Sequence, residues 1–262
     1  MQHLLPVAVR ASNGEHVVRV FEHDDELFAA VPANARDLAV RHGVARVRSL
    51  PIGTWEASAE DDAGALGLLI LNGLILHDVR VGSVTCTELL ARQDLLRPWD
   101  EDPELQPVPM ETAWRVIAPA RLAVLDRRFA VVAGRFPDVM ATLLGRTMTR
   151  ARGVVAMMSI SHMHRVEARL EACLWYLADR FGRVTAEGVV LPLPLTHMAL
   201  GRLVGAQRPS VTTALGELAE QGRVRRLPDG AYLLVGEPPA MRPRQAPGAG
   251  APRQAPGAGA PA

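Results

Sequence analysis

The sequence predicts an α+β protein whose strands come before most of its helices. Short apolar stretches separated by glycine fill residues 45–126, which is typical of antiparallel strands. In residues 137–164, apolar positions recur every three or four residues, as in one long helix. Two short amphipathic helices and a strand pair follow in residues 195–234. We therefore expect an N-terminal antiparallel β-roll, a long helix, and a C-terminal helical domain that ends in a hairpin.

The predicted roll is built from several short strands. A strand is expected in residues 16–21, and residues 24–42 contain helix formers. Asn72-Gly73 has the composition of a tight hairpin turn, and Gly82 is expected in a second turn. Further strands are predicted at residues 84–90, 95–97 and 112–126.

A short helix is expected at residues 126–133, and the longest helix follows at residues 137–164. The long helix has a stripe of apolar and small residues at alternating spacings of four and three, which is typical of a coiled coil. We expect this stripe to pack against the same helix of a second copy; packing along its own domain is the alternative. The predicted dimer interface comprises Met140, Leu144, Thr147, Ala151, Val154 and Met158.

Residues 195–222 have the spacing of a helix-turn-helix. Thr196 can cap the first helix, and Gly205 lies where that helix must end in a left-handed residue. Pro209 fits the first turn of the second helix, where its missing N–H is no loss. Gly201 leaves room for the two helices to cross closely, and Val211 follows at the spacing expected for the second helix.

The second of these helices presents a predicted surface for DNA. Arg208 lies at its N-terminal end, which is the end that enters the major groove in this motif. An arginine there can donate two hydrogen bonds to guanine, and nearby hydroxyls can reach phosphates or base edges. The alternative is an ordinary helical hairpin with a solvated polar face.

The strand pair after the second helix turns at Pro228-Asp229-Gly230 and forms a predicted wing with three arginines. A solvated edge strand is the alternative for these arginines. The predicted DNA-binding residues of the helices and the wing are Thr196, His197, Gln207, Arg208, Ser210, Thr212, Thr213, Arg223, Arg225 and Arg226.

The run L-T-H-x-x-L-x-x-L-V-G-A-x-R-x-S-V-T-x-A-L-x-x-L-x-x-x-G, from Leu195 to Gly222, resembles the C-terminal domain of the CRP/FNR family of bacterial transcription regulators. The resemblance extends to Arg165–Leu170 and Leu122–Asp126, and more faintly over residues 45–126. It implies a cyclic-nucleotide-binding-like sensor at 1–135, a dimerisation helix at 136–165 and a winged helix-turn-helix at 166–238. The implied partners are double-stranded DNA, a second copy of the chain and, as a further candidate, RNA polymerase.

The predicted sensor departs from members of this family that bind cyclic nucleotides. In those members a Gly-Glu holds the ribose and an arginine pairs with the cyclic phosphate; the corresponding positions here fall on Arg97, Pro98 and Met110. We therefore expect weak or no binding of cyclic AMP in the usual manner and no bound cofactor. Arg97 and Trp99 are candidates to line a pocket for another effector. The alternative is an arginine paired with an acid and a tryptophan that fills the roll.

Composition narrows the remaining classes. Residues 1–111 carry 18 acidic residues and 9 arginines, whereas residues 112–262 carry 10 acidic residues and 20 arginines, which suits a second half that meets a polyanion. No apolar run is long enough to span a membrane, so a cytoplasmic protein is expected. Cys86 and Cys173 are too few for an iron–sulfur cluster in one subunit.

Two function classes besides an effector-controlled regulator stay open at this point. One is a regulator whose roll serves only as a dimerisation scaffold, and the other is an enzyme that uses the roll as a pocket. The enzyme class is disfavoured because the chain has no P-loop, nucleophile elbow or dinucleotide fingerprint. His162 and His164, expected within the long helix, face different sides of it, so no metal site is predicted there. Residues 239–262, rich in proline, glycine and alanine, are expected to form a disordered tail.

Overall fold

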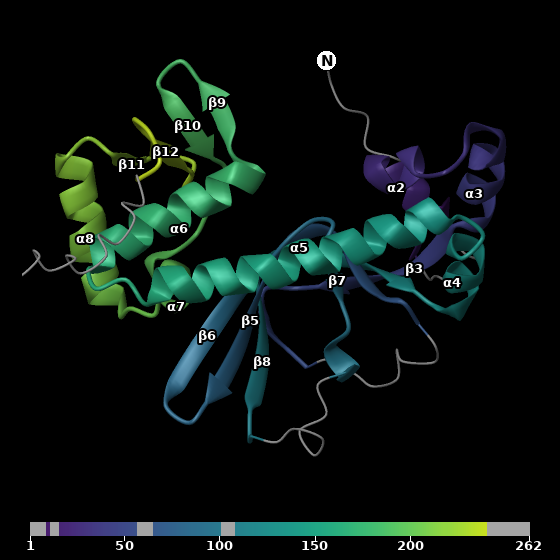
Figure 1. Ribbon diagram of the computed structural model, residues 1–262, viewed down its shortest axis with the longest axis horizontal. Helices are drawn as coiled ribbons and strands as arrows, with labels where there is room; N and C mark the ends of the chain where they lie inside the picture. Colours follow the sequence, from purple (N-terminus) through teal and green to yellow (C-terminus); the bar gives the residue numbers. More distant parts are fainter. Residues whose placement is uncertain (1–8, 11–15, 57–64, 101–107, 240–262) are drawn as a thin grey trace, which may run out of the picture.

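The computed structural model describes residues 9–10, 16–56, 65–100 and 108–239; the predicted tail lies outside these residues except for Pro239. Figure 1 shows one long helix crossing the molecule, with small N-terminal helices at one end and the C-terminal helices at the other. The helices are α1 (Val20–His23), α2 (Asp25–Ala29), α3 (Arg36–His42), α4 (Arg127–Ala133), α5 (Pro137–Ser161), α6 (Val166–Phe181), α7 (His197–Val204) and α8 (Arg208–Glu220), with 3-10 turns η1 (Ala33–Ala35) and η3 (Pro98–Asp100).

The larger of two sheets is antiparallel and runs in the order β1-β2-β3-β8-β5-β6, with β4 paired to β8 and β7 to β5. A smaller sheet, in the order β11-β12-β10-β9, belongs to the C-terminal region. The α+β class and the strand predictions at 84–90 and 112–126 are confirmed. The strands are β1 (Val9–Arg10), β2 (His16–Arg19), β3 (Val44–Leu50), β4 (Gly53–Trp55), β5 (Gly67–Val81), β6 (Val84–Leu90), β7 (Leu95–Leu96), β8 (Glu111–Leu125), β9 (Arg183–Thr185), β10 (Gly188–Leu191), β11 (Val224–Arg226) and β12 (Tyr232–Leu234).

The larger sheet curls around one apolar core. Side chains from β3, β4, β5, β6, β7 and β8 meet there, with Trp55 and Trp114 in edge-to-face contact at 5.5 Å between ring centroids. Trp99 of η3 packs against the same core. Because aromatic side chains bury large areas, these three tryptophans contribute much apolar surface to the core of the roll.

The hairpin predicted at Asn72-Gly73 is wrong. β5 continues through both residues and pairs with β8 before and after them, with shifts of register on each side. Gly73 has a φ of 99°, and a Cβ at this residue would lie 2.4 Å from the Cα of Ala120. The glycine is therefore required by a β-bulge that lets β8 approach closely, and not by a turn between two strands.

The bulge exchanges the two faces of β5. Before it, Leu68 and Ile70 point into the roll and Leu69 packs on the N-terminal helices. After it, Ile75 points into the roll, whereas Leu74 and Leu76 belong to the core of the C-terminal helices. Since side chains alternate along a strand, one irregularity is enough to change which neighbour each residue meets.

Helix α5 joins the two ends of the molecule. Its first turns bury Val139 and Leu143 against the N-terminal helices, and its last turns bury Met157 and Ile160 against the C-terminal core. The helix ends at Ser161, three residues earlier than predicted, so His162 and His164 lie in the connection to α6 and not within the helix. No helix in the described ranges is long and apolar enough to cross a membrane.

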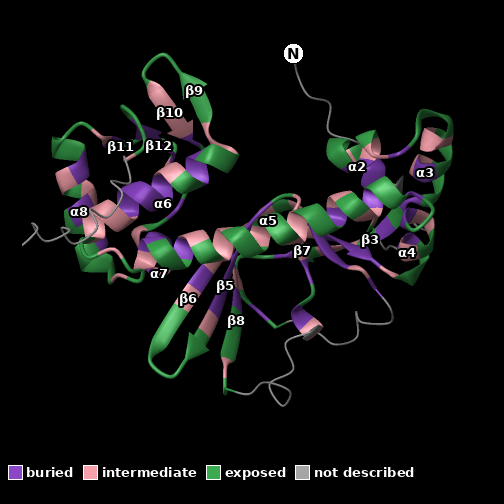
Figure 2. Cartoon of the chain, viewed as in Figure 1, coloured by how far each residue is buried: buried purple, intermediate pink, exposed green. Residues whose placement is uncertain are grey.

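One side of α5 exposes apolar residues, and exposed positions recur along it in Figure 2. Of the six residues predicted at the dimer interface, Leu144, Ala151 and Met158 are exposed, whereas Met140, Thr147 and Val154 are half-buried against the chain itself. The exposed stripe follows the expected spacings of four and three, but Met148 and Val155 take the places of the half-buried residues of the predicted set. We call it the α5 stripe: Leu144, Met148, Ala151, Val155 and Met158.

Candidate nucleic-acid interface

Helix α7 begins and ends as its sequence predicts. The Thr196 hydroxyl accepts a hydrogen bond from the Ala199 N–H at 3.1 Å, which caps the helix start. Gly205 ends the helix with φ 62° and ψ 44°, in the left-handed region that favours glycine. A Cβ at Gly201 would lie 2.5 Å from the carbonyl oxygen of Ala206. The tight connection between α7 and α8 therefore depends on small residues at both glycine positions.

Helix α8 packs with one face and leaves its N-terminal polar residues outside. Val211, Ala214 and Leu218 are buried, and Leu215 is half-buried. Pro209 lies in the first turn, as expected. The predicted contact residues Gln207, Arg208, Ser210, Thr212 and Thr213 are all exposed. These five residues therefore form one solvent-facing surface, which we call the α8 face.

The α8 face is marked by a contact between His197 and Thr212 and by the absence of acidic residues in the sequence around Arg208. The Nδ1 atom of His197 lies 2.9 Å from the Thr212 hydroxyl, which joins the starts of α7 and α8. Burial, together with the positive charges of Arg226 and Arg208, lowers the pKa of His197. Arg208 has no carboxylate partner among the described residues, and no acid lies in residues 207–213. A polyanion would meet an unopposed positive charge there.

The wing forms at the predicted place, but its three arginines make different interactions. Arg223 pairs with Glu171, whose side chain is only 4% exposed. Burial raises the pKa of Glu171, and Arg223 opposes this shift. Arg225 and Glu187 form an exposed pair at 2.6 Å, while Arg226 lies over the Tyr232 ring at 6.0 Å. Arg223 and Arg225 thus each have a carboxylate partner within the chain, whereas Arg226 has none among the described residues; DNA contacts by all three remain a prediction.

A residue outside the predicted set supports the helix-turn-helix. Arg169 of α6 donates hydrogen bonds to the carbonyl oxygens of Val204 and Gly205, at 2.9 and 3.1 Å, which are left free by the end of α7. Arg169 and Val204 are 35 residues apart in the sequence, so no local sequence pattern predicts this contact.

The candidate effector residues lie at the edge of the roll. Arg97 is exposed and donates hydrogen bonds to the carbonyl oxygens of Ala65 and Leu66, at 2.9 and 3.3 Å. Its guanidinium lies 5.8 Å from the Trp99 ring, which packs on the roll core. Neither residue lines the cavity beside α5 and α6 or the smaller one beside β4 and the start of α7. An effector site at these two residues stays a prediction.

Residues 168–242 match the family model of the Crp-like helix-turn-helix domain. Over 73 residues, 27% of this chain, the sequence is 37% identical to the regulatory protein CysR of Synechococcus elongatus. That match spans only 35% of the CysR length.

Solved structures share the fold over more of the chain. A cyclic nucleotide-binding domain containing protein from Listeria monocytogenes matches 71% of this chain and 87% of its own, with a TM-score of 0.58 and 16% identity. FixK2 from Bradyrhizobium japonicum matches 72% and 92%, with a TM-score of 0.53 and 18% identity. A CooA mutant from Carboxydothermus hydrogenoformans matches 72% and 83%, with a TM-score of 0.53 and 15% identity. The chain therefore shares the fold of these solved structures, and its residues 168–242 match the Crp-like helix-turn-helix domain.

Proposed function

We propose that this protein is a dimeric, sequence-specific DNA-binding transcription regulator that acts in the cytoplasm. The observation that carries the proposal is the α8 face, where Arg208 and three hydroxyl side chains are exposed at a helix start without a neighbouring acid. A helix of this kind fits the major groove with its N-terminal end toward the bases. Its arginine can donate two hydrogen bonds to the O6 and N7 atoms of one guanine.

The remaining polar residues would position the protein on the phosphates. Thr196, His197 and Gln207 lie around the two helix starts, and Ser210, Thr212 and Thr213 provide hydroxyl groups beside Arg208. On the wing, Arg226 adds a positive charge without a carboxylate partner among the described residues, and Arg225 adds one that is paired with Glu187. Contacts to phosphates fix orientation without reading sequence, so we assign sequence choice to Arg208 and general affinity to the wing. Arg223 is assigned a structural role because of its pair with Glu171.

Dimerisation is proposed through the α5 stripe. Leu144, Met148, Val155 and Met158 are 63%, 53%, 63% and 46% exposed, which leaves a row of large apolar side chains along one helix. A second copy related by a two-fold axis would cover this row by coiled-coil packing. It would also present two α8 faces to successive major grooves of a palindromic site.

The roll is proposed to respond to an effector other than cyclic AMP. Its interior holds three tryptophans, and Arg97, Pro98 and Met110 occupy the positions at which the family's nucleotide-binding members hold the ligand. A roll that serves only as a scaffold for the dimer is the second candidate, which the same apolar filling favours.

Selection of duplexes from a random pool by the purified full-length chain tests this function. We expect enrichment of a two-fold symmetric sequence with half-site centres about 10 base pairs apart. A double variant, Leu144→Glu with Met148→Glu, should be monomeric and should lose affinity for that site, because two buried charges would face each other across the stripe. Val131→Glu is the matched control, since Val131 is 61% exposed on α4 and lies outside the stripe.

The result that would overturn the function is equally direct. If the wild-type chain enriches no duplex at low salt, the α8 face does not read DNA. If the double variant remains a dimer, the stripe is not the interface. The two readouts are independent, because a monomer with an intact α8 face still binds a half-site weakly.

A further inference from the structure

A cavity of about 570 Å³ is lined by β6, the middle of α5 and the C-terminal half of α6. Its size is in the range of sites for small molecules. Residues of the α8 face do not line it, and neither do Arg97 and Trp99. The cavity thus belongs neither to the DNA-binding surface nor to the place where a ligand was expected from the sequence.

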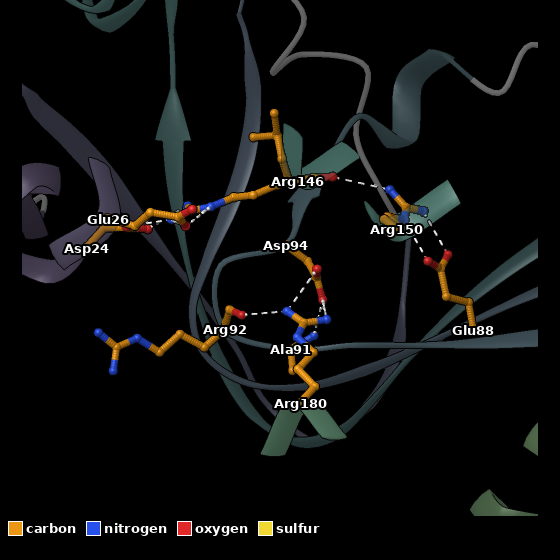
Figure 3. A network of polar contacts seen from close by, with 10 residues as sticks. Asp24, Glu26, Glu88, Ala91, Arg92, Asp94, Arg146, Arg150 and Arg180 are labelled. Atoms are coloured by element: carbon orange, nitrogen blue, oxygen red, sulfur yellow. Dashed lines mark hydrogen bonds and ion pairs between the residues drawn. The ribbon is translucent and has the colours of Figure 1, made fainter. Parts of the chain in front are cut away.

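The polar wall of this cavity is held rigidly by three arginine–carboxylate pairs, which Figure 3 shows together. Arg150 donates to both carboxylate oxygens of Glu88, at 2.7 and 2.9 Å. Arg180 donates to both oxygens of Asp94, at 3.0 Å each. These bidentate pairs fix the direction of each side chain, so the wall is formed before any ligand arrives.

Arg146 forms the third pair and is the most deeply placed. It donates to both oxygens of Asp24, at 2.7 and 2.6 Å, and also to Glu26. Burial works against its charge, but the hydrogen bonds that it donates to Asp24 and Glu26 raise the pKa of Arg146 above its ordinary value. All three guanidinium groups therefore already have anionic partners.

The floor of the cavity is α5, where glycines leave space. A Cβ at Gly145 would meet no atom within 4 Å. At Gly153 a Cβ would lie 2.5 Å from the Tyr176 hydroxyl, so the absence of a side chain lets α6 approach there. Glycine destabilises a helix interior by about 1 kcal/mol relative to alanine, yet α5 keeps both. The open side at Gly145 and the closed side at Gly153 give the cavity its depth.

The charges of the wall select the class of ligand. Four carboxylates, of Glu26, Glu88, Asp94 and Asp179, line the cavity against three guanidinium groups. The side chain of Asp179 has no hydrogen-bond or ion-pair partner among the described residues. An anion would have to displace a carboxylate from a bidentate pair, whereas a cation finds Asp179 available. Tyr176 and Phe181 add aromatic surface beside it.

We propose that this cavity binds a small organic cation, an amine or amidine carried on an aromatic or apolar body. Asp179 pairs with the cationic group, and the body lies over Gly145 between α5 and α6. The site is built jointly by the roll, α5 and the domain that carries the α8 face. On the basis of the proposed DNA-binding function, such a ligand would be the effector, because its binding depends on the relative position of the roll and the DNA-binding domain.

Calorimetric titration of the full-length protein, without DNA, tests the site. Tryptamine and phenethylamine serve as aromatic cations, and indole-3-acetate serves as an anion of similar size to tryptamine. We expect Gly145→Leu to abolish binding of the amines by filling the floor. Gly216→Leu is the matched control, because Gly216 also lies in a helix with open space around its Cβ position but is remote from the cavity. Asp179→Asn should weaken binding about three- to tenfold, and Asp37→Asn on exposed α3 should not.

Each outcome decides the proposal. Amine binding that is lost in Gly145→Leu and kept in Gly216→Leu supports it. Failure of both amines to bind more tightly than about 1 mM, or undiminished binding to Gly145→Leu, overturns the site. Tighter binding of indole-3-acetate overturns the charge class. Because DNA is absent from these titrations, they can fail while duplex selection succeeds, and the reverse also holds.

Discussion

Arginines in two regions of the molecule are used in opposite ways. Along α5 and α6, Arg146, Arg150 and Arg180 are each held by a carboxylate from the roll or its N-terminal helices. At the DNA-binding end, Arg208 and Arg226 have no carboxylate partner within the described residues. The net charge of the chain is +1, so its composition alone does not reveal this division.

The difference shows which positive charges are available to a partner. A guanidinium bound at both nitrogens by a carboxylate holds two elements together and has little affinity left for a phosphate. An exposed arginine without a counter-ion keeps its charge for a polyanion and releases counter-ions when it binds. Removal of an arginine should therefore affect stability in the first region and DNA binding in the second.

The largest effect is expected on stability at Arg146. Arg146→Met should lower the free energy of unfolding by about 3–5 kcal/mol, because it leaves the Asp24 carboxylate, 3% exposed, without its cation. Arg208→Met is the matched control and should change stability by less than about 0.5 kcal/mol. Urea denaturation of both variants measures the difference. Equal stabilities would remove the distinction between the two regions.

The next effect concerns sequence recognition at Arg208. Arg208→Ala should weaken binding to the selected site by about 1–3 kcal/mol and relax the preference at one base pair. Arg226→Ala on the wing should instead weaken binding to all duplexes alike and reduce the salt dependence, because Arg226 has no carboxylate partner among the described residues. Titration of selected and scrambled duplexes at several salt concentrations separates the two. An unchanged preference in Arg208→Ala would assign base reading to another residue.

The smallest effect is a pH dependence from His197. Its pKa is lowered in the free protein by burial and by Arg226 and Arg208, so the ring is neutral at pH 7. Phosphates near it would raise this pKa, so DNA binding would take up a proton. Affinity should therefore strengthen as pH falls below the pKa of the bound state and level off below that of the free protein, by at most about tenfold per pH unit.

Two variants check the origin of this dependence. His197→Gln should bind DNA with a flatter pH profile, whereas His42→Gln, at the exposed end of α3, should keep the wild-type profile. A profile that steepens toward high pH would contradict the assigned sign.

Local chemistry made the helix-turn-helix predictable. The cap at Thr196, the left-handed Gly205 and Pro209 in the first turn of α8 each depend on neighbours within a few residues. The sequence therefore indicates both helix boundaries and the exposed polar set of α8. The ion pair between Arg223 and Glu171 could not be predicted, because the two residues are 52 positions apart and no spacing rule connects them.

Long-range pairing limited the predictions in the roll and along α5. Asn72-Gly73 suits a turn or a bulge equally, and the choice depends on Ala120 of the facing strand. The outward side of α5 is determined by Arg146 and Arg150, which turn toward acids contributed by α2 and β6. Heptad spacing predicts how often exposed positions recur along α5. It cannot predict which face of the helix is exposed, because the acids that fix this face are far away in the chain.

The bulge at Gly73 has a consequence for how the chain tolerates change in length. Removal of one residue from β5 near this position would restore strict alternation of its side chains. His77 would then point outward, and Leu74 and Leu76 would point into the roll. The helical domain would then lose the apolar platform on which it rests, although no residue of that domain had been altered. One extra amino acid in a strand thus aligns two separately built halves of the protein.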